Sequence, residues 1–475
     1  MRGGAWFGCA RVAVRGWRLS VLALVAALVA ALGASAAQAK DPPKPQSIWE
    51  QDTLTGDWDG ARTALKDRGI EFTLNYTGEV LSLLSGGINR RSVYEGLLEF
   101  TTDTDLQKLI GWTGAKTHVT VFQIQNTKGG ITEATGSISA PSSIDALQTT
   151  RLFTAWFEQS FGNVAWLRIG QLAADSEFFW SDTAGTLING TFGWGGNLGA
   201  NMLRGGPAYP LATPGVRLKL MPSDDVAVLG AVFSGDPAGP NCGGADDDPQ
   251  KCNRNGTAGF GLDGGALIIG EVQYAVNQGK HAVGLPGAYK LGGWYATANF
   301  FDQHFGLNAA GVQVTLADPS AAYSLTHQGN GGIYGIADQM VWRGGESSLN
   351  LFVRAGASPS DRNLVSYYVD GGAGLKGPLP GRPDDTLTFG VAYAKISRDA
   401  VALDRDFLTL GGPPYAVRDA ETVLELNYAA QIAPWWTVQP DVQYIVHPGG
   451  GQNGDDPTQV VGHAFIAGIR STIKF

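Results

Sequence analysis

Apolar and polar residues alternate one by one along most of the chain after residue 70. The C-terminal segment, residues 460–475, carries mainly apolar side chains at every second position, and Arg470 and Lys474 lie between them. Successive side chains of a strand point to opposite faces, so this segment is predicted to be a strand with one apolar and one basic face. Such a strand occurs in half-buried soluble sheets and in lipid-facing barrel walls, and the segment alone leaves both open.

The same alternation recurs in segments that are separated by stretches rich in Gly, Asn, Asp and Pro, the composition of turns. These segments are residues 72–80, 94–100, 164–170, 216–220, 267–276, 290–300, 333–343, 349–356, 387–397, 423–430 and 437–446. No β-α-β alternation appears, which argues against α/β folds. The one convincing helix is expected within residues 54–69, ending at Gly69.

Charged residues repeatedly occupy the face opposite the apolar one. They are Glu79, Glu95, Glu99, Arg168, Arg217, Lys219, Arg470 and Lys474. On a single strand these charges would simply face water, but a charged face on nearly every strand favours a water-filled lumen. The pattern therefore predicts an all-β chain, a transmembrane antiparallel β-barrel of about 16 strands, at roughly 25 residues per strand and connection.

The first 39 residues have the features of a signal peptide. Four arginines precede an apolar run at residues 19–32, and Ala37-Gln38-Ala39 supplies a small-residue cleavage site. The run is shorter than the ~20 residues of a transmembrane helix, so cleavage after Ala39 and export are expected. We divide the chain into a signal peptide (1–39), an extended segment with a short periplasmic helix (40–69) and a barrel domain (70–475).

Charge and motifs narrow the function. The net charge of −9 becomes −13 without the four arginines of residues 1–39, which disfavours nucleic-acid binding. The sequence has no Gly-x-Ser-x-Gly, His-Glu-x-x-His or phosphate-binding loop. We therefore expect that the protein is not an enzyme and binds neither a cofactor nor a metal ion. An outer-membrane lipase stays open, because a serine and a histidine can meet in the fold without a local motif. Cys242 and Cys252 are expected to close a loop by a disulfide.

Five blocks in order along the chain resemble the carbohydrate-selective porins of the OprB type. They are GDWDGAR (56–62), YTGE (76–79), DLQKLIGW (105–112), GRPDDTLTFGV (381–391) and WWTVQPDVQYIVHPGG (435–450). The resemblance implies a Gram-negative outer-membrane barrel that passes sugars such as glucose by facilitated diffusion. It also implies that the terminal strand, ending at Phe475, is the signal read by the barrel assembly machinery. A general small-solute porin is the main alternative, and a homo-oligomer is compatible with the pattern.

A sugar channel needs aromatic surfaces for the C–H face of the ring and charged groups for its hydroxyls. Trp156 and Glu158 share one strand face, and Trp166 and Arg168 have inward parity on the next strand. The resemblance to the OprB-type porins also implies a block in which an arginine is followed by a tryptophan, and Arg151 and Trp156 fit it. The candidate constriction is Glu79, Arg91, Glu95, Arg151, Trp156, Glu158, Trp166 and Arg168. Trp156 would equally suit a girdle of aromatic residues at the membrane interface. Glu79, Glu95 and Arg168 could instead line wider parts of the lumen, and Arg91 could lie in a solvated turn. Residues 190–206 are a candidate for a loop that folds inward and narrows the pore.

Overall fold

The computed structural model describes residues 47–239, 242–243, 248–260, 264–278, 282–410 and 414–475. The expected signal peptide, residues 1–39, and the first part of the expected extended segment lie outside these residues.

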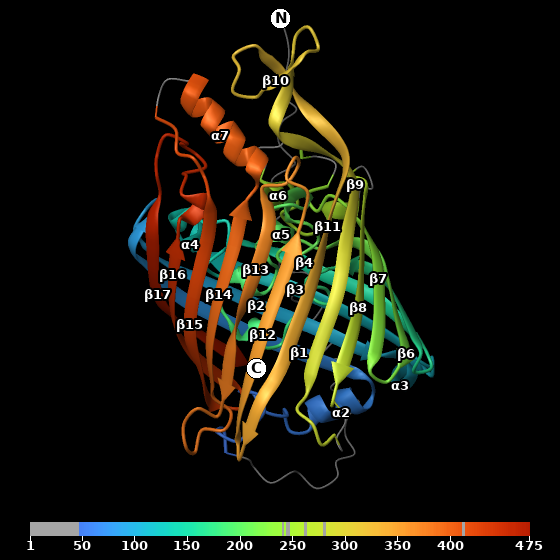
Figure 1. Ribbon diagram of the computed structural model, residues 1–475. Helices are drawn as coiled ribbons and strands as arrows, with labels where there is room; N and C mark the ends of the chain where they lie inside the picture. Colours follow the sequence, from blue (N-terminus) through green and yellow to red (C-terminus); the bar gives the residue numbers. More distant parts are fainter. Residues whose placement is uncertain (1–46, 240–241, 244–247, 261–263, 279–281, 411–413) are drawn as a thin grey trace, which may run out of the picture.

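The described residues form a closed antiparallel β-barrel (Figure 1). Within them, 17 strands lie in one sheet, of which 16 make the wall, because β9 pairs directly with β11 and the three-residue β10 only extends that hairpin. The strands are β1 (Ile70–Gly87), β2 (Ser92–Asp105), β3 (Ala115–Asn126), β4 (Thr149–Phe161), β5 (Ala165–Leu172), β6 (Thr213–Ser223), β7 (Val226–Ser234), β8 (Ala266–Val276), β9 (Gly287–Asn308), β10 (Gln313–Thr315), β11 (Ala321–Gly344), β12 (Ser347–Ala357), β13 (Val365–Lys376), β14 (Thr386–Ile396), β15 (Ala420–Ala433), β16 (Trp436–Val446) and β17 (Gly462–Lys474). The predicted barrel and its strand number are confirmed.

The barrel closes between its first and last strands. β1 pairs antiparallel with β17, and Glu79 lies directly opposite Arg470. The Arg470 Nε donates to Glu79 Oε2 at 2.6 Å. Closure of an antiparallel barrel predicts that the strands within residues 72–80 and 460–475 pair, with both charges on the inner wall, and the structure confirms it.

Side chains divide between the two faces of the wall as the alternation predicts. On β5 and β6, Ile169 and Leu218 are exposed on the outside, whereas Arg217 is buried inside. The connections also differ between the two ends: residues 162–164 and 345–346 are short turns, whereas 173–212 is a long segment. In outer-membrane barrels the short turns are periplasmic, which orients this barrel.

Six short or medium helices accompany the strands in the described part of the chain. They are α2 (Ala61–Asp67), α3 (Leu106–Ile110), α4 (Gly130–Thr135), α5 (Gly196–Gly199), α6 (Pro249–Cys252) and α7 (Arg398–Leu410). Single 3-10 turns occur at η1 (Ala184–Thr186), η2 (Gly190–Phe192), η3 (Leu203–Gly205), η4 (Ala258–Phe260) and η5 (Pro448–Gly450). None of the helices in the described ranges is long and apolar enough to cross a membrane.

The helix expected in residues 54–69 is present as α2, at the end of the barrel with the short turns (Figure 1). The prediction that it is the one convincing helix was wrong, because the 13-residue α7 lies at the opposite end. α7 buries only Ala400 and Asp404. Apolar residues nevertheless recur along it at helical spacing, at Ala400, Leu403, Phe407 and Leu410, so periodicity could have indicated this helix.

Two long connections fold into the lumen, residues 127–148 and 173–212, and we call them the first and second inward segments. The second contributes Phe178, Phe192 and Leu198, which are almost completely buried in one apolar cluster with wall residues. The expectation that residues 190–206 fold inward is confirmed, and the inward path is longer than expected. The two segments divide the interior of the barrel and leave cavities beside them.

Wall carboxylates hold both inward segments by accepting hydrogen bonds from their backbone. In the second segment, Glu271 accepts from the N–H of Phe179 at 3.0 Å and Asp338 accepts from that of Thr183 at 2.9 Å. In the first, Glu421 accepts from the N–H of Ile138 at 2.8 Å. Buried backbone N–H groups need partners, and these side chains supply them from the wall.

Candidate functional site

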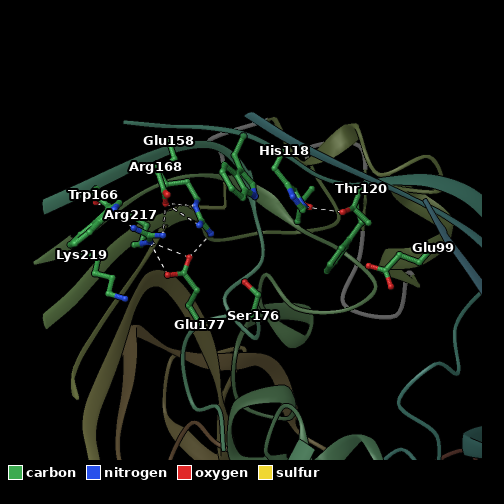
Figure 2. Close-up of a pocket in the computed structure, with 13 residues that line it drawn as sticks. Glu99, His118, Thr120, Glu158, Trp166, Arg168, Ser176, Glu177, Arg217 and Lys219 are labelled. Atoms are coloured by element: carbon green, nitrogen blue, oxygen red, sulfur yellow. Dashed lines mark hydrogen bonds and ion pairs between the residues drawn. The ribbon is translucent and has the colours of Figure 1, made fainter. Parts of the chain in front are cut away.

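A cavity of about 510 Å³ lies in the lumen between strands β2 to β6 and the second inward segment (Figure 2). Its lining is rich in charge and in aromatic rings, the two features that we expect of a sugar path. Six charged side chains line it: Glu99, Glu158, Arg168, Glu177, Arg217 and Lys219.

Four of these charges form a closed network of ion pairs. Arg168 binds Glu158 at 2.9 Å and Glu177 at 2.7 Å. Arg217 binds the same two glutamates, each at 2.8 Å. The four side chains are only 4% to 20% exposed, so bulk water screens these pairs less than it would on an open surface.

Strand register explains how three of the four charges meet. On β4, β5 and β6, Glu158 lies opposite Arg168, and Arg168 lies opposite Arg217. Two arginines directly opposite each other on neighbouring strands would repel. Glu158 on the wall and Glu177 on the second inward segment bridge both, so the network also ties that segment to the wall.

The Trp156 ring lies between the side chains of Arg168 and His118. The guanidinium of Arg168 is 3.8 Å from the centre of its ring, and the His118 ring stacks on it at 4.7 Å with an interplanar angle of 10°. His118 Nδ1 is in turn 2.7 Å from an oxygen of Asp103. Because β4 lies between β3 and β5, His118 and Arg168 approach Trp156 from opposite sides. The indole therefore supports the charged network, and it has little open face for a ligand.

Trp166 is the second indole of the cavity and is half-buried, like Trp156. It lies opposite Lys219 in the β5–β6 register, and the Lys219 Nζ is 5.8 Å from the centre of the ring. The Trp166 carbonyl also accepts a hydrogen bond from Arg217 at 3.3 Å. An indole beside charged donors can contact the C–H face of a sugar while the charges bind its hydroxyls.

The structure brings together four of the eight predicted constriction residues: Trp156, Glu158, Trp166 and Arg168 all line this cavity. The other four lie on wall strands or in the β1–β2 turn, outside this cavity, and contact the inward segments. Their role in the constriction stays a prediction, and the contacts below describe where they are.

Glu79 and Glu95 are almost fully buried in the wall. Glu79 binds Arg470 and the Ser142 hydroxyl, and Glu95 accepts a hydrogen bond from the Ile131 N–H at 2.8 Å. Both glutamates thus contact the first inward segment.

Arg91 and Arg151 also contact inward backbone. Arg91 donates to the Gly130 carbonyl at 3.1 Å and pairs with Glu133 at 3.1 Å. Arg151 is 1% exposed and donates to the Pro210 carbonyl at 3.2 Å. Neither arginine lines the cavity between β2 and β6.

Sequence reasoning did not place Glu177 or His118 at the site. His118 lies on β3 and has inward parity, so strand alternation could have indicated it. Glu177 lies in the second inward segment, whose path depends on contacts with the wall, and no sequence pattern marks it. Arg217 was predicted to face the lumen, but alternation does not show which inward charges meet.

The two remaining predicted features of the side-chain chemistry are a disulfide and the lack of a metal. A disulfide joins Cys242 to Cys252, with the Cα atoms 5.5 Å apart, in the connection between β7 and β8. Among the residues that the structure describes, no group of three or more His, Cys, Asp or Glu side chains could hold a metal ion.

The chain is similar to several known porins. A family model described as "Carbohydrate-selective porin, OprB family" matches residues 90–475. Porin B of Pseudomonas aeruginosa is 28% identical over 472 residues, which cover 94% of this chain and 96% of that protein. The putative porin QuiX of Acinetobacter baylyi is 25% identical over 485 residues, covering 96% and 99%. The high-pH structure of Pseudomonas putida OprB is 25% identical, with a TM-score of 0.76 over 90% of this chain and 100% of that one.

Proposed function

The chain belongs to the carbohydrate-selective porins of the OprB family, and on that premise we propose that sugars contact the cavity around Arg168 and Trp166 as they cross. The protein is an outer-membrane porin that passes carbohydrates through its barrel. The observation that carries the proposal is one cavity in which the Trp166 indole adjoins a network of two arginines and two glutamates.

This arrangement suits transient binding. Hydrogen bonds to charged groups are stronger than neutral ones, so the network can replace part of the hydration of the sugar hydroxyls. Each of the four charges in the network is already paired with two charges of opposite sign. A sugar hydroxyl therefore competes with these ion pairs, and its own hydrogen bond to the network is weakened. Binding that remains weak permits release, which a channel requires. The proposed role is passage, and we propose no catalytic residues.

The test is block of ion current by glucose in planar bilayers. Trp166→Ala and Arg168→Ala should each raise the glucose concentration for half-maximal block about two- to tenfold, since one aromatic or charged contact contributes roughly 0.5–1.5 kcal/mol. Trp156→Ala should act in the same direction by releasing Arg168 and His118. The matched control is Trp342→Ala, because this exposed indole lies on β11 outside the cavity.

Unchanged glucose block in both Trp166→Ala and Arg168→Ala would remove this cavity from the sugar path. A general small-solute porin is distinguished by swelling of proteoliposomes. Equal rates for sugars and for amino acids of similar size would favour the general porin, whereas faster entry of sugars supports the carbohydrate-selective pore.

We further propose three features that concern export and assembly. Residues 1–39 would be a signal peptide cleaved after Ala39, and Phe475 would form part of the signal that the barrel assembly machinery recognises. The exposed apolar band of the wall is compatible with a homo-oligomer in the outer membrane.

A further inference from the structure

We propose that Lys219 and Trp166 form a subsite for sugar acids, meaning polyhydroxylated carboxylates such as uronates and aldonates. The proposal rests on the function proposed above, because it needs this cavity to be the sugar path. It adds a class of substrate: an anionic sugar whose carboxylate binds the Lys219 ammonium while its C–H face lies on the Trp166 indole.

The distribution of charge in the cavity singles out Lys219. The two arginines are already paired with carboxylates, because Arg168 and Arg217 each bind Glu158 and Glu177. In the part of the chain that the structure describes, Lys219 has no ion pair, and its ammonium lies over the Trp166 ring, 5.8 Å from the ring centre. An ammonium has three donors and no acceptor, so Lys219 can bind an anion without breaking the four-charge network.

The register fixes Lys219 and Trp166 as a pair. They lie directly opposite each other on β6 and β5, and the next inward row along these strands is Arg217 and Arg168. Two residues along a strand span about 7 Å, so the pair lies one row from the network, on the side of the short turns. A solute that enters from the side of the long connections therefore meets the network first and Lys219 with Trp166 next.

The opposite wall of the cavity favours one orientation of an anionic solute. Glu99 lines the cavity from β2, across from β5 and β6, and Figure 2 shows Glu99 and Lys219 at opposite ends of the site. A carboxylate is repelled by Glu99 and attracted by Lys219. The hydroxyls of the same molecule then face the network, whose glutamates can accept hydrogen bonds from them.

The experiment compares glucuronate with glucose as blockers of ion current through the full-length porin in planar bilayers. The two probes share the same ring and differ in one carboxylate. We expect glucuronate to block the unmodified pore at lower concentration than glucose. Lys219→Gln should weaken glucuronate block about tenfold more than glucose block, because the contact between two opposite charges is lost only for the acid.

Lys376→Gln is the matched control, since it removes the same charge from an exposed lysine at the end of β13, outside the cavity. Lys376→Gln should change neither the block by glucuronate nor the block by glucose. An equal loss of glucuronate block in Lys219→Gln and Lys376→Gln would attribute the effect to net charge and overturn the subsite.

The outcomes separate this inference from the proposed function. If glucose does not block the unmodified pore, the proposed sugar path itself fails. If glucose blocks it, and Lys219→Gln leaves the ratio of glucuronate to glucose block unchanged, the sugar path stands and the sugar-acid subsite is overturned.

Discussion

The Arg354 guanidinium lies fully buried between the wall and the second inward segment. It pairs with Asp370 at 2.6 Å and donates to the carbonyl groups of Phe179, Gly193 and Thr191. A charge in such a position is retained only with several partners, since removal from water is costly. Arg354 therefore links strands β12 and β13 to three points of the inward backbone.

We predict that Arg354→Ala lowers the free energy of unfolding by about 3–5 kcal/mol, because it leaves the Asp370 carboxylate buried without its cation. The double variant Arg354→Met/Asp370→Leu should recover part of this loss, since neither charge then remains buried while the three carbonyl groups still lack their donor. Urea unfolding in lipid vesicles measures both values. Arg343→Ala, an exposed arginine on β11, is the control and should change stability little. A double variant as unstable as the single one would contradict the explanation.

At the scale of single residues, alternation predicted which charges point inward and did not predict what they contact. Arg168 and Glu158, both predicted to point inward, lie side by side because neighbouring strands carry them at matching positions. Glu95 shares their inward parity, yet it binds the backbone of Ile131 and is covered by the first inward segment. The difference arises from loop paths, which no strand pattern encodes.

Among the elements, the second inward segment depends on hydrogen bonds to the wall. At its middle, Glu425 of β15 accepts from the N–H groups of Ile188 at 2.6 Å and Asn189 at 2.9 Å. Asn189 also donates its side-chain amide to Gln443 of β16 at 3.0 Å. This region lies on the wall opposite β5 and β6, where the segment begins and ends.

We predict that Glu425→Gln loosens this attachment, because the amide group replaces one accepting oxygen with a donor that faces backbone N–H groups. Loss of one buried hydrogen bond costs about 1–3 kcal/mol, so the amides of Ile188 and Asn189 should exchange hydrogen roughly 5- to 150-fold faster. Hydrogen–deuterium exchange of the reconstituted barrel measures this. Glu346→Gln, in the exposed β11–β12 turn, should leave the exchange of both amides unchanged. Equal exchange in both variants would show that Glu425 does not hold the segment.

Strands were predictable as elements because lipid outside and water inside impose a period of two on each of them. The helix α7 lies beyond the wall and was not predicted, although its apolar residues recur at helical spacing. The inward segments were predicted only as the candidate loop at residues 190–206. Their sequences are rich in glycine and small polar residues, which indicates turns whether the chain folds inward or outward.

At the scale of the whole molecule, closure brings residues 54–74 and the C-terminal residues together. The backbone N–H of Phe475 donates to the Leu74 carbonyl at 2.8 Å, and Arg62 of α2 donates to the Phe475 carbonyl at 2.8 Å. The N–H of Leu54 donates to the Lys474 carbonyl at 2.8 Å. The pairing of the terminal strands was predictable from the requirement that an antiparallel barrel has no free edge.

We predict that Phe475→Ala reduces the amount of folded barrel in the outer membrane, if the terminal aromatic residue is part of the assembly signal. The control is Phe465→Ala, an outward phenylalanine on the same strand that is 37% exposed. Folded and unfolded protein can be separated by electrophoresis of unheated membrane samples. Similar losses in both variants would indicate a general need for apolar side chains on β17 and would contradict a special role for the terminus.

The second inward segment also has a mechanical consequence. Its ends leave the wall at β5 and β6, and Arg354, Asp338 and Glu425 hold it at β12, β11 and β15, on the far side of the ring. A ring of strands without such a brace can flatten into an ellipse when crowded neighbours press on it from the side. Here flattening would have to stretch or compress a packed segment that spans the interior. The size limit of the pore should therefore be insensitive to lateral pressure in the membrane.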